Sequence, residues 1–175
     1  MDFSFTPEQL MFREAVSHFA KKELEPYVKG MEATDRFPVE VFKKLGDLGY
    51  LGVHFPSEWG GADADFISFC IVIEEICYVS AAIGINVLLH SLMASVPIYL
   101  VGSDEQKQRY FLPAMRGERI GAAGLTEPNV GSSAGDIETT AQRVDGGWKV
   151  RGAKMFTSNG PYCDFLTLVV STDRE

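Results

Sequence analysis

The sequence contains few cysteines, few histidines and no cluster of basic residues. Its three cysteines, Cys70, Cys77 and Cys163, are odd in number and lack the spacing of metal ligands. They support neither a metal site nor a disulfide framework, and indicate buried thiols of a reducing compartment. Sixteen Lys and Arg residues against 24 Asp and Glu residues give a net charge of −8. Without a basic face, no nucleic-acid partner is expected.

Recognisable targeting features are also missing at the N-terminus. Residues 1–5 have neither the basic start and apolar run of a signal peptide nor the Arg-rich pattern of a transit sequence. We therefore expect a bacterial or archaeal cytoplasmic protein, or the processed form of a mitochondrial matrix protein. The apolar run 83–100 is long enough to cross a membrane. Because it contains Asn86, His90 and Pro97, we prefer a helix that is buried on all sides within a soluble helical domain, and no integral membrane segment is expected.

The first part of the chain has the hydrophobic spacing of helices. Two capping boxes, Thr6 with Gln9 and Ser103 with Gln106, predict helix starts, and Pro26 is expected to end the first helix. A second helix is expected from Pro38 to Gly49.

Two further helices are expected in the middle of the chain. Asp65 can cap one of them, which carries Glu74 and Glu75 side by side. Adjacent acids on a helix diverge, so they cannot form a catalytic dyad, and one of them is expected to be buried and paired. The other helix, residues 81–100, is expected to be the most buried.

After Gly117 the pattern changes to short runs rich in β-branched residues. Residues 139–144 and 148–151 flank Asp145-Gly146-Gly147, a hairpin signal, and 165–171 predict a buried strand. The predicted fold class is α+β: an all-α helical-bundle domain over 1–118, followed by an incomplete β-barrel or β-sandwich domain over 119–175. At least one strand edge would be left open.

Two short motifs carry the candidate chemistry. The first, residues 121–133, reads Gly-Ala-Ala-Gly-Leu-Thr-Glu-Pro-Asn-Val-Gly-Ser-Ser. A strand is expected to end at Leu125 and Thr126 and to be stopped by Pro128. Gly131 then allows a turn whose amides and hydroxyls suit anionic oxygens.

The second motif, residues 154–160, reads Lys-Met-Phe-Thr-Ser-Asn-Gly. Phe156 offers an aromatic face, Thr157 and Ser158 offer hydroxyls, and Asn159 with Gly160 predicts a turn. Together the motifs predict a site for a flat, polar ligand.

In this order, the two motifs resemble those of the acyl-CoA dehydrogenases. The resemblance continues upstream through Glu74-Glu75, Pro97-Ile98-Tyr99 and Gly-Ser-Asp-Glu-Gln-Lys at 102–107, so it covers nearly the whole chain. It implies an FAD-dependent oxidoreductase of fatty-acid β-oxidation. Such an enzyme removes the α proton of an acyl-CoA with a carboxylate and transfers the β hydrogen as hydride to FAD N5, giving trans-2-enoyl-CoA. A homotetramer, with an electron-transferring flavoprotein as oxidant, is also implied.

The resemblance assigns cofactor-binding roles motif by motif. Ala123, Leu125 and Thr126 would face the flavin ring and its pyrimidine edge. Phe156 would pack on the isoalloxazine, and Ser158 would present its hydroxyl or amide near N5.

The resemblance also implies residues that bind the substrate. Ser132 would lie near the FAD pyrophosphate and the CoA entrance. The family's helix corresponding to 81–100 helps to wall the acyl pocket, so His90, Ser91, Met93 and Ala94 are candidates for lining it, with core packing as the alternative.

The motifs depart from the usual family pattern. Ser133 replaces an Asp and removes a carboxylate, while Ser158 replaces a Thr and keeps the hydroxyl donor. Phe156 replaces a Trp and keeps an aromatic face, at a cost of about 0.5–1.5 kcal/mol if it stacks.

No catalytic residue is assigned, because the family's base comes from a third, C-terminal helical domain that we expect to be absent from this chain. Two other interpretations stay open. The chain could be a half-length, non-catalytic partner subunit that completes a flavin site only with another polypeptide. It could also be part of a flavin oxidase or monooxygenase on the same fold, which rapid reaction of the reduced flavin with oxygen would distinguish.

Overall fold

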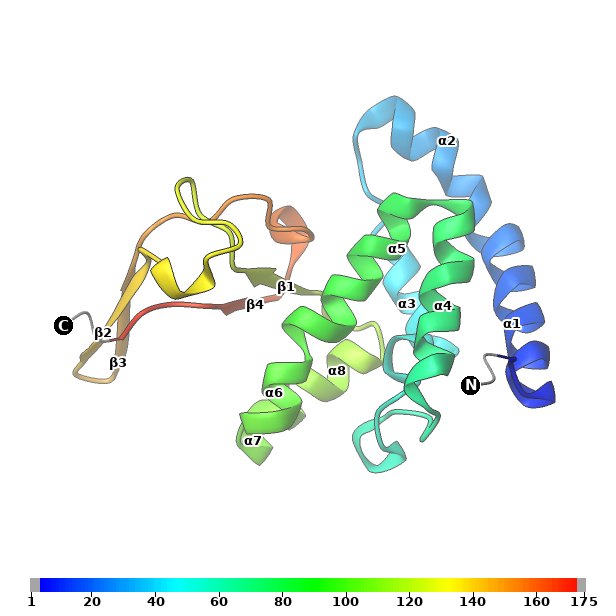
Figure 1. The fold of residues 1–175 in the computed structure, drawn as a ribbon, viewed down its shortest axis with the longest axis horizontal. Coiled ribbons are helices and arrows are strands. Elements are labelled where there is room, and N and C mark those ends of the chain that lie inside the picture. Colours follow the sequence, from blue (N-terminus) through cyan, green and yellow to red (C-terminus); the bar gives the residue numbers. More distant parts are fainter. Residues whose placement is uncertain (1–3, 173–175) are drawn as a thin grey trace.

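The computed structural model describes residues 4–172, in which a helical part is followed by a smaller β part (Figure 1). The α-helices are α1 (Pro7–Phe19), α2 (Glu25–Thr34), α3 (Glu40–Asp47), α4 (Phe66–Val79), α5 (Ala81–Leu88), α6 (Val96–Val101), α7 (Asp104–Gln106) and α8 (Leu112–Met115). The π-helical segments Ala20–Leu24, Leu89–Ala94 and Lys107–Phe111 lie between α1 and α2, α5 and α6, and α7 and α8. The strands are β1 (Gly121–Gly124), β2 (Thr140–Val144), β3 (Gly147–Arg151) and β4 (Phe165–Leu168). This architecture confirms the predicted fold class.

The core of the helical part is built from the inward faces of α1, α3, α4 and α5. Its largest fully buried side chains include Phe42, Leu45, Phe69, Ile76 and Ile83. Each such side chain contributes roughly 1.5–3 kcal/mol through its removal from water. A smaller cluster forms next to α8, with Phe55, Phe111, Ala114 and Met115 buried together. The two clusters fix the helices that support the β part.

Local capping determines where several helices begin. Both predicted capping boxes are present, with Gln9 N–H donating to Thr6 Oγ1 at 3.2 Å and Gln106 N–H donating to Ser103 Oγ at 3.2 Å. The prediction that Pro26 ends the first helix is wrong. The π-helical turn Ala20–Leu24 shifts the hydrogen-bond pattern, so that Pro26 falls in the first turn of α2, where no N–H is needed.

The predicted pairing of one acid in α4 is confirmed. Glu75 is 6% exposed, and its carboxylate accepts a hydrogen bond from Arg13 Nε at 2.6 Å. Glu74 is exposed and lies 3.4 Å from the same guanidinium. The pair connects α1 to α4, and the two carboxylates share one cation without forming a catalytic dyad.

The apolar helix 81–101 is buried on one side only. By length and composition it could cross a membrane, although core helices of water-soluble proteins meet the same criterion, and 39% of its most apolar stretch is buried. Leu100 is 68% and Val101 86% exposed, so the expectation of burial on all sides is wrong. Its inner side packs against α4, where Gly84 meets Cys77, and against β1. This contact with β1 joins the two parts of the molecule.

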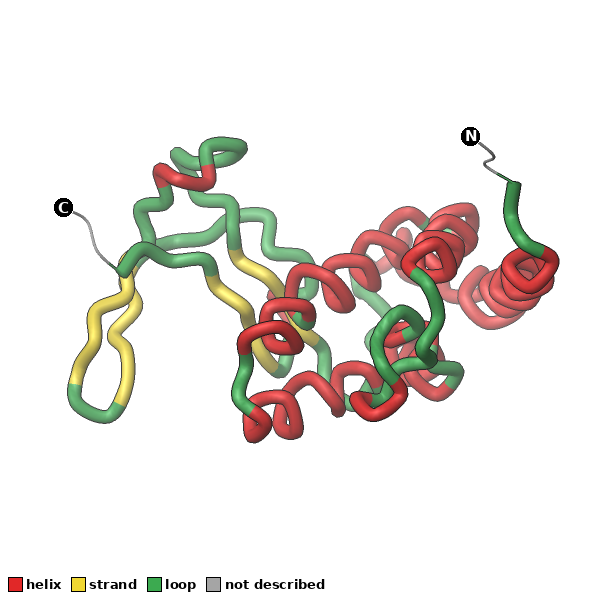
Figure 2. The backbone as a smooth tube through the Cα atoms, turned by 60° about the horizontal axis from the view of Figure 1, so that its bottom comes forward, coloured by secondary structure: helices red, strands yellow, loops and turns green. Residues whose placement is uncertain are grey.

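The β part consists of two strand pairs. β1 and β4 are parallel, with Gly121 opposite Phe165 and Gly124 opposite Leu168. The predicted hairpin is confirmed: β2 and β3 are antiparallel, and Gly146 adopts φ +78° in the turn. The hairpin extends away from the helices (Figures 1 and 2). β4 is half-buried rather than buried, because it pairs only with β1 among residues 4–172.

Candidate functional site

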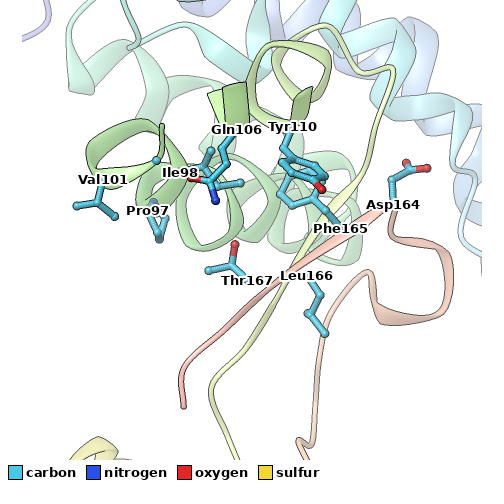
Figure 3. A pocket seen from close by; sticks show the side chains of 10 residues that line it. Pro97, Ile98, Val101, Gln106, Tyr110, Asp164, Phe165, Leu166 and Thr167 are labelled. Atoms are coloured by element: carbon cyan, nitrogen blue, oxygen red, sulfur yellow. The ribbon is translucent and has the colours of Figure 1, made fainter. Parts of the chain in front are cut away.

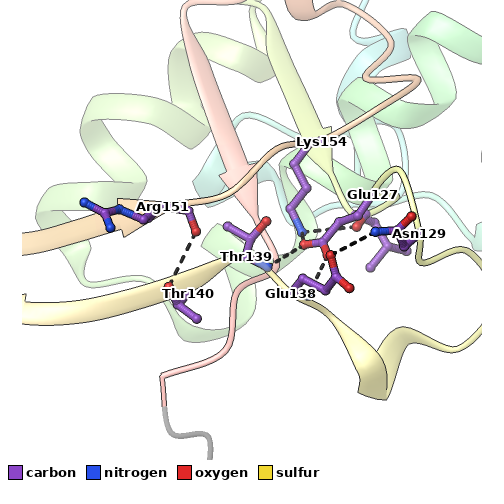
Figure 4. A network of polar contacts seen from close by, with 8 residues as sticks. Glu127, Asn129, Glu138, Thr139, Thr140, Arg151 and Lys154 are labelled. Carbon is purple, nitrogen blue, oxygen red and sulfur yellow. Dashed lines mark hydrogen bonds and ion pairs between the residues drawn. The ribbon is translucent and has the colours of Figure 1, made fainter.

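A buried carboxylate, Glu127, joins the two sequence motifs (Figure 4). Its side chain is 1% exposed and accepts a hydrogen bond from Lys154 Nζ at 2.7 Å. It also accepts the backbone N–H groups of Glu138 at 2.6 Å and Thr139 at 2.9 Å. Burial raises the pKa of Glu127, but the ammonium and amide donors outweigh burial and lower the pKa to about 2. The ionised carboxylate accepts hydrogen bonds from all three donors, so it fixes the backbone at Glu138 and Thr139 rather than exchanging a proton.

Lys154 extends this connection to the backbone of the first motif. Its Nζ donates a second hydrogen bond to the carbonyl oxygen of Leu125 at 3.1 Å. The next residue, Met155, donates its N–H to Thr126 O at 2.8 Å. The two motifs thus lie side by side, as the close view of Lys154 above Glu127 shows (Figure 4). The sequence interpretation missed this pair; its signal was one acid and one base within motifs otherwise rich in apolar and small residues.

Phe156 presents its ring to solvent from an unusual backbone conformation. The residue is 84% exposed and has φ +54°. A bulky residue in the left-handed region is a conformational outlier, and such outliers cluster at ligand sites. Asn159 is also left-handed at φ +64°, as expected for the turn, and Ser158 between them is half-buried. This local conformation leaves the aromatic face of Phe156 open for contact.

An apolar cavity of about 370 Å³ lies between helix 81–101 and the β1–β4 pair. It brings together Ala123 and Leu125 from the first motif and Met93 from the helix. Its lining is completed by Leu92, Val96, Pro97, Gly124, Thr167 and Val169. Of the helix residues expected to line a pocket, only Met93 does so, because Ser91 and Ala94 are buried in the core.

His90 also lies in the core, with both ring nitrogens bonded. Nε2 lies 3.1 Å from Ala114 O, and Nδ1 accepts the N–H of Gly121 at 3.0 Å. Burial lowers the pKa of the imidazole to about 4, although the bond to Ala114 acts in the opposite direction. The ring is 0% exposed and has no free polar atom. This geometry does not support the expected substrate contact of His90 and favours the alternative of core packing.

The turn after Pro128 is exposed, including Ser132 and Ser133. Ser133 Oγ donates to the carboxylate of Asp136, so an acid from the following 3₁₀ turn contacts the position where the usual Asp is missing. Ser132 remains accessible at the surface. The turn therefore keeps the Ser132 hydroxyl accessible to an anionic ligand, whereas the Ser133 hydroxyl donates to Asp136.

A second, larger cleft of about 640 Å³ lies between helices α6 and α7 and strand β4 (Figure 3). Two of its polar side chains, Thr167 and Asp164, already have partners within the chain. Thr167 Oγ1 donates to Ala94 O at 2.8 Å, and the Asp164 carboxylate accepts the N–H of Ile120 at 2.7 Å. None of the sequence-predicted site residues lines this cleft. Nor do residues 4–172 contain a cluster of three or more metal-ligating side chains.

Two family models match successive stretches of the chain. The family model described as "Acyl-CoA dehydrogenase, N-terminal domain" matches residues 6–118, and "Acyl-CoA dehydrogenase, middle domain" matches residues 122–175. The short-chain specific acyl-CoA dehydrogenase of Clostridium acetobutylicum is 38% identical over 174 residues, which are 99% of this chain and 46% of that protein. The chain thus spans about half the length of this curated relative.

Solved structures share the fold over 97–100% of the chain. A glutaryl-CoA dehydrogenase from Mycobacterium smegmatis in complex with FADH2 has a TM-score of 0.91 and 30% identity, covering 97% of this chain and 44% of its own. A chain from a structure of the electron-transferring flavoprotein of Acidaminococcus fermentans has a TM-score of 0.89 and 34% identity, covering 100% of this chain and 46% of its own. The chain therefore belongs to the acyl-CoA dehydrogenases, a family of FAD-dependent oxidoreductases.

Proposed function

We propose that this chain forms the helical and flavin-facing parts of an enzyme that oxidises an acyl-CoA thioester to trans-2-enoyl-CoA. The observation that carries the proposal is the Glu127–Lys154 pair, which holds the two motifs together beside an apolar cavity. Bound FAD supplies the hydride acceptor, its N5 atom. The residues of this chain provide the surface that binds and orients that cofactor and the thioester.

The chemistry of the available groups fits FAD. The exposed ring of Phe156 suits an aromatic ring system, and the walls at Ala123 and Leu125 are apolar. Thr126 and Ser158 add hydroxyl groups for a polar ring edge, while the accessible turn at Ser132 suits a pyrophosphate or the entrance for CoA. We assign these residues to the cofactor, and Ser132 also to the substrate.

The proton-abstracting base is proposed to lie outside the described residues. The buried carboxylate of Glu127 is ionised and carries several hydrogen bonds, so it cannot reach or exchange a substrate proton. The third helical domain is the proposed source of the base, and we keep 1–118 and 119–175 as the two domains of this chain. The chain matches 46% of the length of its Clostridium acetobutylicum relative, which supports a source of the base outside the described residues.

The same family membership supports the proposed partners. We propose a homotetramer that passes electrons to an electron-transferring flavoprotein, an acceptor consistent with the Acidaminococcus fermentans structure. The bacterial relative supports a cytoplasmic location, and a processed form would belong in the mitochondrial matrix.

The proposal is tested by the visible spectrum and intact mass of the purified native protein. Saturated acyl-CoAs of different chain lengths are then added without oxygen or another oxidant. Bleaching of a flavin spectrum by one thioester is the expected result and identifies the substrate class. Fast reoxidation by oxygen alone would indicate an oxidase or monooxygenase, and a flavin-free protein with the mass of these 175 residues would indicate a partner subunit.

A matched pair of variants tests the site itself. Phe156→Ala is expected to weaken FAD binding, because it removes the proposed aromatic platform. Trp148→Ala serves as the control, since Trp148 is also an exposed aromatic, at 56%, but lies on the distant hairpin. Equal FAD affinity in the two variants would contradict the assignment of Phe156.

A further inference from the structure

The peptide groups at the start of β1 are held by side chains on both sides. The N–H of Gly121 donates to His90 Nδ1 at 3.0 Å, and its carbonyl oxygen accepts from Asn159 Nδ2 at 3.2 Å. His90 is 0% and Asn159 1% exposed, so water does not compete for either bond. Buried hydrogen bonds of this kind are costly to leave unmade. Gly121 is therefore a fixed point between the helices and the strand.

The ring of His90 can make this contact in one neutral tautomer only. A backbone N–H donates, so Nδ1 must accept from Gly121, and the hydrogen on Nε2 is then donated to Ala114 O at 3.1 Å. Ala114 belongs to α8, whereas Gly121 opens β1. The imidazole thus connects α8 to β1 directly.

Close packing leaves β1 little freedom to shift at this point. A Cβ atom at Gly121 would lie 2.5 Å from the ring of Phe165 and 2.8 Å from Cβ of Ala94. The strand therefore rests against the π-helical segment Leu89–Ala94, which carries His90. On the neighbouring strand, Thr167 Oγ1 donates to Ala94 O at 2.8 Å and fixes β4 to the same segment.

We propose that His90 is a positioning residue, which sets the placement of β1 through the N–H of Gly121. Ala123 and Leu125 follow Gly121 at intervals of two residues, and both line the apolar cavity. A change at the His90 contact is transmitted along the strand to these side chains. The effect on the cofactor rests on the proposed function, whereas the effect on the strand does not.

Two substitutions separate the contacts of the ring. In His90→Gln, the amide nitrogen can still donate to Ala114 O, but no acceptor remains at the position of Nδ1. In His90→Asn, the amide oxygen lies near the position of Nδ1 and can accept from Gly121, but the side chain does not reach Ala114. Each variant loses one hydrogen bond, so each controls for the stability lost in the other.

The measurements are amide hydrogen exchange at Gly121 and Ala122, the Kd for FAD after removal and titration of the flavin, and urea unfolding, all on the full native protein. The positioning role predicts faster exchange in His90→Gln and a Kd for FAD that is about threefold to tenfold higher. This ratio corresponds to the free energy of one hydrogen bond. It predicts exchange and Kd near the native values in His90→Asn, although both variants lose stability.

Equal effects of the two variants on exchange and Kd would overturn the proposal, because a merely structural residue does not distinguish the two contacts. Faster exchange in His90→Gln with an unchanged Kd would also overturn it, since β1 would have moved without consequence for the cofactor. If the native protein does not bind FAD at all, the proposed function fails, and the exchange data still decide whether His90 places the strand.

Discussion

Replacing Asn159 with alanine removes a side chain that combines two stabilising features. Its amide donates to Asn86 O at 3.0 Å and to Gly121 O at 3.2 Å, which connects α5, β1 and the second motif. A net contribution of roughly 0.5–1.5 kcal/mol for each bond gives about 1–3 kcal/mol. Alanine in place of asparagine at φ +64° adds about 1 kcal/mol, because its Cβ disfavours the left-handed region. The expected loss of unfolding free energy is therefore about 2–4 kcal/mol.

Asn159→Gly separates the two contributions, since glycine lacks the side-chain amide but adopts a positive φ without strain. We expect it to lose about 1–3 kcal/mol, and Asn159→Ala to lose about 1 kcal/mol more. Urea unfolding followed by far-ultraviolet circular dichroism measures both values. A loss below about 0.5 kcal/mol in both variants would refute the contribution of the amide bonds. Equal losses would refute the backbone contribution.

Four further perturbations test the buried polar and packed contacts. Lys154→Met leaves Glu127 buried without its cation and should lower both the unfolding temperature and the FAD affinity. Adding Glu127→Gln to this variant should restore part of both. If it restores neither, a charge effect is excluded. Because the folded pKa of Glu127 is depressed, its ionised carboxylate contributes fully to the unfolding free energy above the ordinary pKa of 4.5, and this contribution should be lost as the pH falls towards about 2. Urea unfolding measures this loss, which should be missing in Glu127→Gln. The folded pKa of His90 is also depressed, so the unfolded chain binds its proton first and stability should fall by about 3 kcal/mol between pH 6.5 and 4, a slope that His90→Asn should remove. Gly84→Ala places a Cβ 2.1 Å from Cys77 Sγ and should cost about 1–3 kcal/mol in thermal unfolding, and Cys77→Ala in the same chain should restore part of this loss.

Features fixed by neighbouring residues could be predicted from the sequence. The two capping boxes and the Gly146 hairpin depend on residues a few positions apart, and all three are present. Pro26 misled the prediction because the preceding π-helical turn changes which backbone groups need partners.

The arrangement of the candidate site depends on longer distances along the chain. Glu127 and Lys154 are 27 residues apart, and His90 bonds residues 24 and 31 positions away. No local pattern specifies which buried polar group meets which, because tertiary packing decides it. The motifs therefore predict a site at residues 121–133 and 154–160, while the contacts that hold the two motifs together became visible only in the fold.

The backbone of Phe156 has an entropic consequence for any flat ligand that binds there. The Met155 bond to Thr126 O on one side and the buried amide of Asn159 on the other restrict the chain before a ligand arrives. Binding then needs to immobilise only the two side-chain torsions of the ring, at about 0.5–1.5 kcal/mol, and not the loop that carries it. The conformational entropy of this loop is thus lost during folding, so its loss does not weaken the binding of a ligand.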